Sequence, residues 1–267
     1  MRPTVIKLGG ALLDAPQAHA AAFDALAACV RATPAVIVHG GGKAVDRQLE
    51  ALGMPTQKRD GIRITPPDQM EQITGVLAGC MNARMVGLLC ARGVKAVGLT
   101  LGDAGTTAAR LTTRYAFDTG RVGEITGGDI TLLRTLLAAG FVPVLSSIAL
   151  DAQGEALNVN ADEASAAIAR LLPASRLALL TDVPGVKDAS GRVVPELDAT
   201  ACQAMIDRGE ITGGMIAKVR GALEAARLAH VPVLVAGWSD PHALGRLADP
   251  DAPGTRFTPS AQETIHA

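Results

Sequence analysis

Residues 36–43 read VIVHGGGK, an apolar β-branched run followed by a histidine, three glycines and a lysine. The apolar run predicts a buried strand, and the residues after it predict a helix over Ala44–Leu52. A strand that enters a helix through glycines leaves unpaired backbone N–H groups and the positive end of the helix dipole facing outward. The segment therefore predicts an anion-binding turn, although its spacing matches neither the Walker A loop nor the G-x-G-x-x-G dinucleotide turn.

Strand and helix patterns alternate along the rest of the chain. Short β-branched runs predict strands at Thr4–Leu8, Ala35–His39, Ala96–Leu99, Val142–Ser146, Leu177–Leu180 and Val231–Ala236. Apolar periodicity predicts further helices at Gln17–Ala32, Pro67–Arg92, Ile130–Ala139, Glu163–Leu171, Met215–Ala229 and Pro241–Ala248. Leu111–Tyr115 and Arg121–Thr126 are expected to form a hairpin inserted on the sheet. The alternation predicts an α/β protein with a largely parallel sheet covered by helices.

A weak boundary near Pro173–Ser175 separates a helix from the following strand. We expect two lobes, residues 1–175 and residues 176–267, that share one continuous sheet.

The composition narrows the class of protein. The chain has 267 residues, is 48% hydrophobic and carries 25 Lys and Arg against 26 Asp and Glu, a balance that favours neither nucleic acid nor an anionic membrane as partner. Its four cysteines form no C-x-x-C pair, which predicts a reduced protein without a metal site. The N-terminus does not resemble a secretion signal, and the apolar region around Leu132–Leu150 is interrupted by Arg134, Gly140 and Pro143. We therefore expect a cytoplasmic protein without a membrane span.

Three further motifs place lysines, glycines and acidic residues at the ends of predicted elements. They are Lys7–Gly10, Asn158–Glu163 and Thr212–Lys218. Taken singly, such motifs usually form turns, helix caps or solvated side chains. A lysine near a helix N-terminus, as predicted for Lys218, opposes the dipole unless a phosphate is shared between them. The conjunction of all four motifs favours phosphate chemistry.

This ordered set resembles the amino acid kinase family, and within it the branch whose acceptor is N-acetyl-L-glutamate. The resemblance runs through residues 5–10, 39–42, 60–65, 98–103, 158–162, 180–186 and 213–218 to residues 254–256, nearly the whole chain. It implies a three-layer α/β/α sandwich in which residues 1–175 bind the acceptor and dimerise and residues 176–267 bind ATP. Residues 98–103 depart from many relatives of the family, a difference expected to tune affinity.

The resemblance also implies a role for individual residues in a transfer of phosphate from ATP to the side-chain carboxylate of N-acetyl-L-glutamate, a step of arginine biosynthesis. The catalytic residues would be Lys7 and Lys218, which contact the transferred phosphoryl group, and Asp162, which holds both lysines. The acceptor site would comprise Gly10, Gly40, Gly41, Gly42, Arg63, Asn158 and Asn160, with Arg63 on the α-carboxylate. The ATP site would comprise Asp182, Gly185, Thr212, Gly213 and Met215. Mg²⁺ would be held mainly by the ATP phosphates and water, without a protein metal site.

Independent chemistry agrees with this assignment, because a carboxylate acceptor is already deprotonated at neutral pH and needs no general base. His39 is accordingly expected to bond nearby backbone and to support the glycine turn, without transferring a proton.

Several alternatives remain open from the sequence. Other kinases of the family, in particular one acting on carrier-bound aminoadipate, share the fold, and a non-catalytic nucleotide-binding protein would keep it without turnover. A nicotinamide-dependent dehydrogenase is disfavoured by the missing dinucleotide turn. Arginine-inhibited relatives carry an additional N-terminal helix, whereas the first predicted strand here begins by Thr4. We expect a homodimer that is insensitive to arginine.

Overall fold

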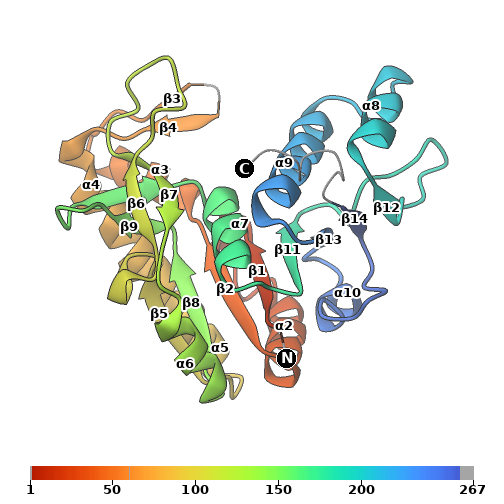
Figure 1. The fold of residues 1–267 in the computed structure, drawn as a ribbon, viewed down its shortest axis with the longest axis horizontal. Coiled ribbons are helices and arrows are strands. Elements are labelled where there is room, and N and C mark those ends of the chain that lie inside the picture. The colour runs from red at the N-terminus through yellow and green to blue at the C-terminus, as the bar shows by residue number, and fades with distance from the viewer. Residues whose placement is uncertain (1, 60, 259–267) are drawn as a thin grey trace.

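The protein is described by a computed structural model that covers residues 2–59 and 61–258. Its centre is an eight-stranded sheet in the order β12-β14-β13-β11-β1-β2-β8-β5 (Figure 1). These strands are β1 (Thr4–Leu8), β2 (Ala35–His39), β5 (Ala96–Thr100), β8 (Val142–Ser146), β11 (Arg176–Thr181), β12 (Glu196–Leu197), β13 (Val233–Gly237) and β14 (Thr255–Phe257). All neighbours pair in parallel except β13 and β14, so the predicted α/β fold with a largely parallel sheet is confirmed.

The two predicted lobes meet at the centre of this sheet. Strand β1 pairs with β2 on one side and with β11 on the other, and β11 is the first strand after the Pro173–Ser175 boundary. Figure 1 shows the sheet passing without a break from one lobe to the other. The expected continuous sheet is therefore confirmed.

Helices cover both faces of the sheet because alternate strand residues are apolar on both sides. On β1, Ile6 and Leu8 face one hydrophobic cluster, whereas Val5 faces the other. The larger helices are α2 (Ala20–Ala32), α3 (Gly42–Ala51), α5 (Asn82–Cys90), α6 (Thr131–Ala138), α7 (Ala161–Leu171), α8 (Ala199–Asp207) and α9 (Gly214–Ala229). The short helices are α1 (Gly10–Asp14), α4 (Met70–Thr74) and α10 (Pro241–Gly245), with the 3-10 turns η1 (Pro67–Gln69) and η3 (Asp103–Gly105).

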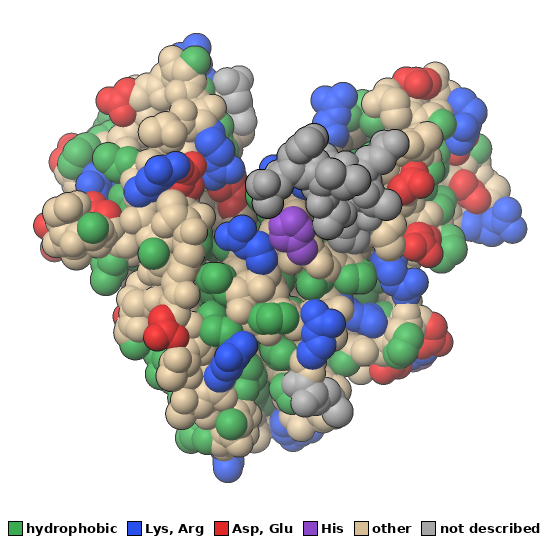
Figure 2. Space-filling view, in the orientation of Figure 1, with side chains coloured by type: hydrophobic (Ala, Val, Ile, Leu, Met, Phe, Trp, Pro, Cys, Tyr) green, Lys and Arg blue, Asp and Glu red, His purple; other side chains and the backbone are tan. Residues whose placement is uncertain are grey.

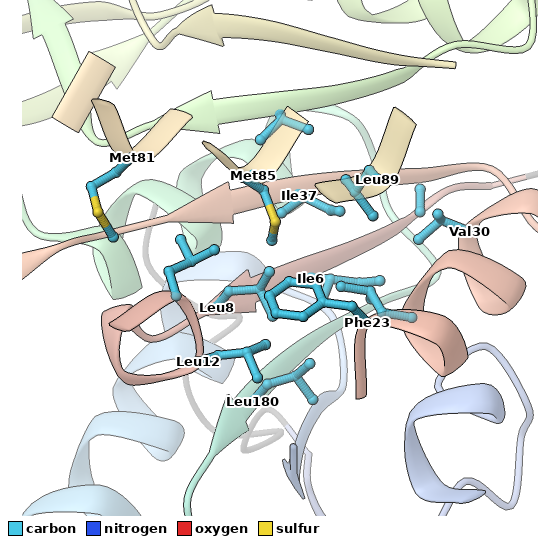
Figure 3. Close-up of a cluster of buried hydrophobic side chains, with 14 of the residues drawn as sticks. Ile6, Leu8, Leu12, Phe23, Val30, Ile37, Met81, Met85, Leu89 and Leu180 are labelled. Carbon is cyan, nitrogen blue, oxygen red and sulfur yellow. The ribbon is translucent and has the colours of Figure 1, made fainter. Parts of the chain in front are cut away.

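The first hydrophobic cluster joins elements from both ends of the chain. In Figure 3, Phe23 lies beside Ile6 and Leu8, with Met85 above them and Leu180 of β11 below. All of these side chains except Leu180, at 1%, are 0% exposed. Burying them removes apolar surface from water, the main favourable contribution to folding. Because strands of both lobes contribute to the cluster, it fixes the bases of the two lobes to each other.

The predicted helix Pro67–Arg92 is continuous but irregular. Between α4 and α5 lies a seven-residue π-helical segment, η2 (Gly75–Met81). The run Pro67–Cys90 has 24 residues, and an 18-residue window within it has a mean hydropathy of 1.5, sufficient by length and composition to cross a membrane. One face of the run, which includes Ile73, Leu77 and Leu89, is instead buried in the first hydrophobic cluster. Packing in the protein core explains this composition.

Two smaller sheets stand beside the main one. The predicted hairpin exists, but its strands are β6 (Ala108–Leu111) and β7 (Val122–Gly127), so the first strand ends where it was predicted to start. It also belongs to a separate four-stranded sheet with β9 (Ile148–Leu150) and β10 (Ala156–Val159), which corrects its placement on the main sheet. A two-stranded hairpin, β3 (Gln57–Arg59) and β4 (Ile62–Ile64), was not predicted. These short strands pair through backbone geometry that periodicity does not reveal.

His39 is the last residue of β2 and is 0% exposed. Burial disfavours its charged form and lowers the pKa from 6.5 to about 4. As the pH falls from about 6.5 towards 4, the unfolded chain takes up a proton that the folded chain does not, so the free energy of unfolding decreases by about 1.4 kcal/mol per pH unit. Above about pH 6.5 the ring is neutral in both the folded and the unfolded chain, and this loss of stability is absent.

We therefore expect a His39→Gln variant to lose part of this acid sensitivity. Urea unfolding at pH 7.5, 6 and 5 should show the stability difference between wild type and variant shrinking as the pH falls. Parallel pH profiles would contradict the assignment.

Candidate active site

A cavity of about 340 Å³ opens at the carboxyl ends of β1 and β2. Parallel strands place their carboxyl ends at one edge of a sheet, the usual location of ligand sites in α/β proteins. Figure 2 shows the molecule hollowed between the lobes, with Lys and Arg side chains on the flank that the N-terminal lobe turns toward the hollow. The predicted site residues that line the cavity are Lys7, Gly10, Gly40, Gly41, Gly42, Arg63, Asn158, Asn160 and Asp162.

Two glycine turns form one wall of the cavity. One leads from β1 into α1 through Gly9 and Gly10, and the other leads from β2 into α3 through Gly40 and Gly41. A Cβ atom at Gly10 would lie 3.1 Å from Gly41 Cα, so the two backbones are nearly in contact. Any residue other than glycine at position 10 would therefore push these two backbone segments apart. The free N–H groups at the starts of α1 and α3 can therefore face the same ligand.

Lys7 and Asp162, which also line the cavity, form an ion pair with each other. Lys7 Nζ lies 2.9 Å from Asp162 Oδ1, and the lysine side chain is only 16% exposed. Asp162 is fixed because it stands in the first turn of α7, where the Asn160 side chain accepts hydrogen bonds from the backbone N–H groups of Asp162 and Glu163. The carboxylate also lies at the helix end that favours negative charge. Asn160 thus has a capping role in addition to lining the cavity.

Lys218 differs from the expectation that Asp162 holds both lysines. It projects from α9 of the C-terminal lobe and donates a hydrogen bond to Asp182, which directly follows β11. This bond lowers the pKa of Asp182, and the charge of Lys43 adds to the effect. In this arrangement of the lobes, Asp182 is the ion-pair partner of Lys218, whereas Asp162 pairs with Lys7. Lys218 is absent from the lining of the cavity.

Arg63 is held by contacts of its Nη2 atom. Its Nη2 donates to the carbonyl of Gly42 at 3.0 Å and lies 2.6 Å from Asp46 Oδ1, while Lys58 Nζ lies 2.8 Å from the other Asp46 oxygen. Burial opposes ionisation of Asp46, yet the hydrogen bonds from Lys58 and Arg63 lower its pKa. The buried Nη1 of Arg63 has no hydrogen-bond partner among the described residues. A buried, unpaired guanidinium N–H is a strong potential donor to a carboxylate.

Asn158 lies on β10 and donates through Nδ2 to Thr65 Oγ1 at 3.1 Å. The buried Thr65 also joins the end of the β3–β4 hairpin to Gly120 through a β-bridge. Asn158 and Arg63 are therefore positioned by connected elements.

The remaining predicted residues lie in the C-terminal lobe, and none of them lines the cavity. Gly185 adopts φ +150°, and a Cβ atom there would lie 2.7 Å from Thr255 Oγ1, so its conformation and packing both require glycine. Gly213 precedes α9 with φ +54°, Thr212 is exposed and Met215 is half-buried. Together with Asp182 they occupy the end of β11, the loop after it and the start of α9.

Sequence reasoning assigned no site role to several polar residues that the structure places at or beside the cavity. Lys58, Arg114, Tyr115 and Glu163 also line the cavity, and Asp46 orients Arg63. Arg114 bridges Glu163 and Glu124, which ties the β6–β7 loop to the start of α7. Except for Glu163, which ends the Asn158–Glu163 motif, these residues belong to no motif, and their proximity arises only from folding. In residues 2–59 and 61–258, no group of three His, Cys, Asp or Glu side chains could hold a metal ion.

Chemically, the cavity combines a fixed lysine, N–H groups of two glycine turns and an arginine with a free donor. Such a set binds two anionic groups and stabilises charge that develops between them.

Comparison with known proteins agrees with this geometry. The acetylglutamate kinase of Edwardsiella ictaluri (strain 93-146) is 45% identical over 259 residues, which cover 96% of this chain and 99% of that protein. Among solved structures, the N-acetylglutamate synthase of Neisseria gonorrhoeae complexed with coenzyme A and N-acetyl-glutamate matches with a TM-score of 0.78 at 22% identity, covering 97% of this chain and 60% of that one. The carbamate kinase of Giardia lamblia bound to AMP-PNP matches with a TM-score of 0.65 at 17% identity, covering 97% and 99%.

The two structural matches bear on the fold alone. The sequence profile of the amino acid kinase family matches residues 2–237, and on that match and the near-full-length relative the chain belongs to the amino acid kinase family.

Proposed function

We propose that the protein is a kinase that transfers the γ-phosphoryl group of ATP to the side-chain carboxylate of N-acetyl-L-glutamate, giving N-acetyl-L-glutamyl 5-phosphate for arginine biosynthesis in the cytoplasm. The observation that carries the proposal is a single cavity in which Lys7 and two glycine turns face one anion and Arg63 keeps a free donor for another. The near-full-length identity to an acetylglutamate kinase supports this acceptor.

The acceptor site supplies orientation and charge. The carboxylate attacks without a base, so the barrier lies in bringing two anions together and in stabilising the charge of a loose transition state. Lys7, kept in place by Asp162, neutralises the transferred group, and the N–H groups of Gly10 and Gly41 donate to oxygens that gain charge. Arg63 binds the α-carboxylate and Asn158 lies beside it, which fixes the acceptor in line with the phosphoryl group.

The C-terminal lobe, residues 176–267, binds ATP in this proposal, with Asp182, Gly185, Thr212, Gly213 and Met215 around the nucleotide. The N-terminal lobe, residues 1–175, binds the acceptor. Because Lys218 is paired with Asp182, it reaches the phosphoryl group only when the lobes approach. Mg²⁺ held by the ATP phosphates and water would neutralise phosphate charge, and the donor set fits this mode because its acidic residues are already paired with lysines.

A homodimer formed through the N-terminal lobe is part of the proposal. Strand β5 is an edge of the eight-stranded sheet, and an edge strand offers unpaired backbone groups to a second copy. Beside it, the helical run η2–α5 exposes small residues at every fourth position: Gly75, Gly79, Ala83 and Gly87. Small side chains allow the close approach of another helix.

The activity is tested by a steady-state assay with MgATP in which hydroxylamine traps the acyl phosphate. We expect turnover with N-acetyl-L-glutamate and little with L-glutamate. A Lys7→Met variant should lower kcat about a hundredfold to a thousandfold, the effect of removing one placed donor. A matched Lys95→Met variant, at the exposed amino end of β5, should leave kcat unchanged. ATP binding without turnover of N-acetyl-L-glutamate would refute the proposed acceptor.

Arg63→Lys tests acceptor recognition. Lysine keeps the charge but loses the fork that contacts Gly42 and Asp46 while donating to the acceptor. We expect the KM for N-acetyl-L-glutamate to rise about tenfold to a hundredfold, with the KM for MgATP unchanged. Arg134→Lys, on the exposed surface of α6, is the control. An unchanged acceptor KM would remove Arg63 from the site.

Gly79→Arg tests the dimer surface, because a long charged side chain would keep a second helix away. Light scattering should give a dimer for the wild type and a monomer for the variant, whereas Gln203→Arg on the exposed face of α8 should remain dimeric. A monomeric wild type would disprove the dimer, and a dimeric Gly79→Arg would move the interface elsewhere.

A further inference from the structure

A buried polar chain links the main sheet to the Gly40–Gly42 turn. His39 Nδ1 lies 3.2 Å from the carbonyl oxygen of Gly40, and His39 Nε2 lies 3.1 Å from Asn82 Nδ2. His39 is 0% exposed and Asn82 4% exposed. Because the Asn82 amide nitrogen only donates, Nε2 must accept, and Nδ1 therefore carries the proton and donates to Gly40. The ring is neutral and held in one tautomer.

Asn82 is itself fixed by the sheet. Its Nδ2 also donates to the carbonyl of Val144 on β8 at 2.9 Å and lies 3.4 Å from that of Leu99 on β5. Gly98 leaves space for the carboxamide, since a Cβ atom there would lie 2.2 Å from Asn82 Oδ1. Asn82 begins α5, directly after the π-helical segment η2. π-Helical turns often occur at functional sites, and this one sets the residue that reaches His39.

The same helical run supports the glycine turn from beneath. A Cβ atom at Gly41 would lie 2.9 Å from Leu77 Cδ2 and 3.2 Å from Met81 Cγ, both in η2. Leu77 and Met81 thus contact the middle of the turn, while the next residue, Asn82, reaches its first peptide through His39. Two independent contacts from one segment fix the turn.

The direction of the Gly40 carbonyl decides what the cavity presents to an anion. The Gly40–Gly41 peptide bond is trans, so its C=O and N–H point in opposite directions. With the carbonyl bonded to His39 in the interior, the Gly41 N–H points the other way, and it has no acceptor among the hydrogen bonds of the described residues. A flipped peptide would present a carbonyl oxygen to two anions.

We propose that Asn82 is a positioning residue of the reaction, which acts through His39 to hold the Gly40–Gly41 peptide with its N–H toward the transferred group. The inference rests on the proposed function for the identity of the anion. Asn82 belongs to none of the glycine and lysine motifs of the site and does not line the cavity, whereas Leu77 of the π-helical segment does.

Two substitutions at His39 distinguish the effect of its hydrogen bonds from the effect of its size. In His39→Gln the amide can accept from Asn82 and donate to Gly40, whereas His39→Leu can do neither. We expect kcat to fall about a hundredfold in His39→Leu and to remain within about tenfold of wild type in His39→Gln, with the KM for MgATP unchanged in both. ADP binding by calorimetry verifies that both variants are folded. Equal kcat values for two folded variants would overturn the proposal.

Asn82→Asp gives a second readout in the pH profile. The introduced carboxylate only accepts, so Nε2 of His39 must carry a proton to bond to it. A neutral ring then has no proton on Nδ1, and the hydrogen bond to the Gly40 carbonyl exists only while both ring nitrogens are protonated. Burial and the Gly40 carbonyl are the influences on the pKa of His39 in the wild type; its register partners are the uncharged Leu8 and Ser146. We therefore expect kcat of Asn82→Asp to fall as the pH rises through a raised His39 pKa, a step absent from the wild type. A kcat that shows no such step would contradict the proposal.

The tautomer can be measured without any activity. Nitrogen-15 NMR of labelled histidine, assigned by the signals that His39→Gln removes, should show a neutral ring protonated at Nδ1 at pH 7. A wild type without turnover would refute the proposed function alone, whereas a ring protonated at Nε2 would refute the positioning role alone.

Discussion

The contact between two glycine backbones is the constraint on which the site depends. Gly10 and Gly41 approach so closely that a single methyl group would separate them, and this approach brings the starts of α1 and α3 to one ligand. Everything around the contact maintains it: the pairing of β1 with β2, the capped start of α7 against Gly40, and the side chains of η2 under Gly41. The site is a product of sheet pairing and of the absence of side chains at a few positions.

The charges of the site are balanced before any substrate arrives. Each of the two central lysines has its own carboxylate, Asp162 for Lys7 and Asp182 for Lys218, and Arg63 has Asp46. Pairing offsets the repulsion that neighbouring cations would otherwise cause and keeps each donor pointing in one direction. As a consequence, a bound phosphate or carboxylate must share these cations with the aspartates that already pair with them, which favours ligands carrying more than one negative charge. ATP and a dicarboxylic acceptor both meet that condition.

Much of the fold and part of the site could be predicted from the sequence. The parallel sheet, its helices and the meeting of the Lys7 and Gly40–Gly42 segments follow from β-branched runs and from glycines at strand ends. The β3–β4 hairpin and α8 lacked a clear period, and β6 was displaced because the residues after Leu111 continue a strand-like composition in a loop. Asp46 and Asn82 could not be found from motifs, since each acts on a residue distant in sequence or through a buried partner. The partner of Lys218 depends on the separation of the lobes, which local sequence does not encode.

The unbroken sheet has a mechanical consequence for how the lobes come together. Because β1 hydrogen-bonds to β11 along its whole length, no flexible linker separates the lobes at their base. In the proposed reaction, the approach of Lys218 to the acceptor therefore requires twisting and bending of the strands, with the deformation spread over many hydrogen bonds. A continuous sheet of this kind resists large displacements of one half relative to the other and keeps the two halves in register.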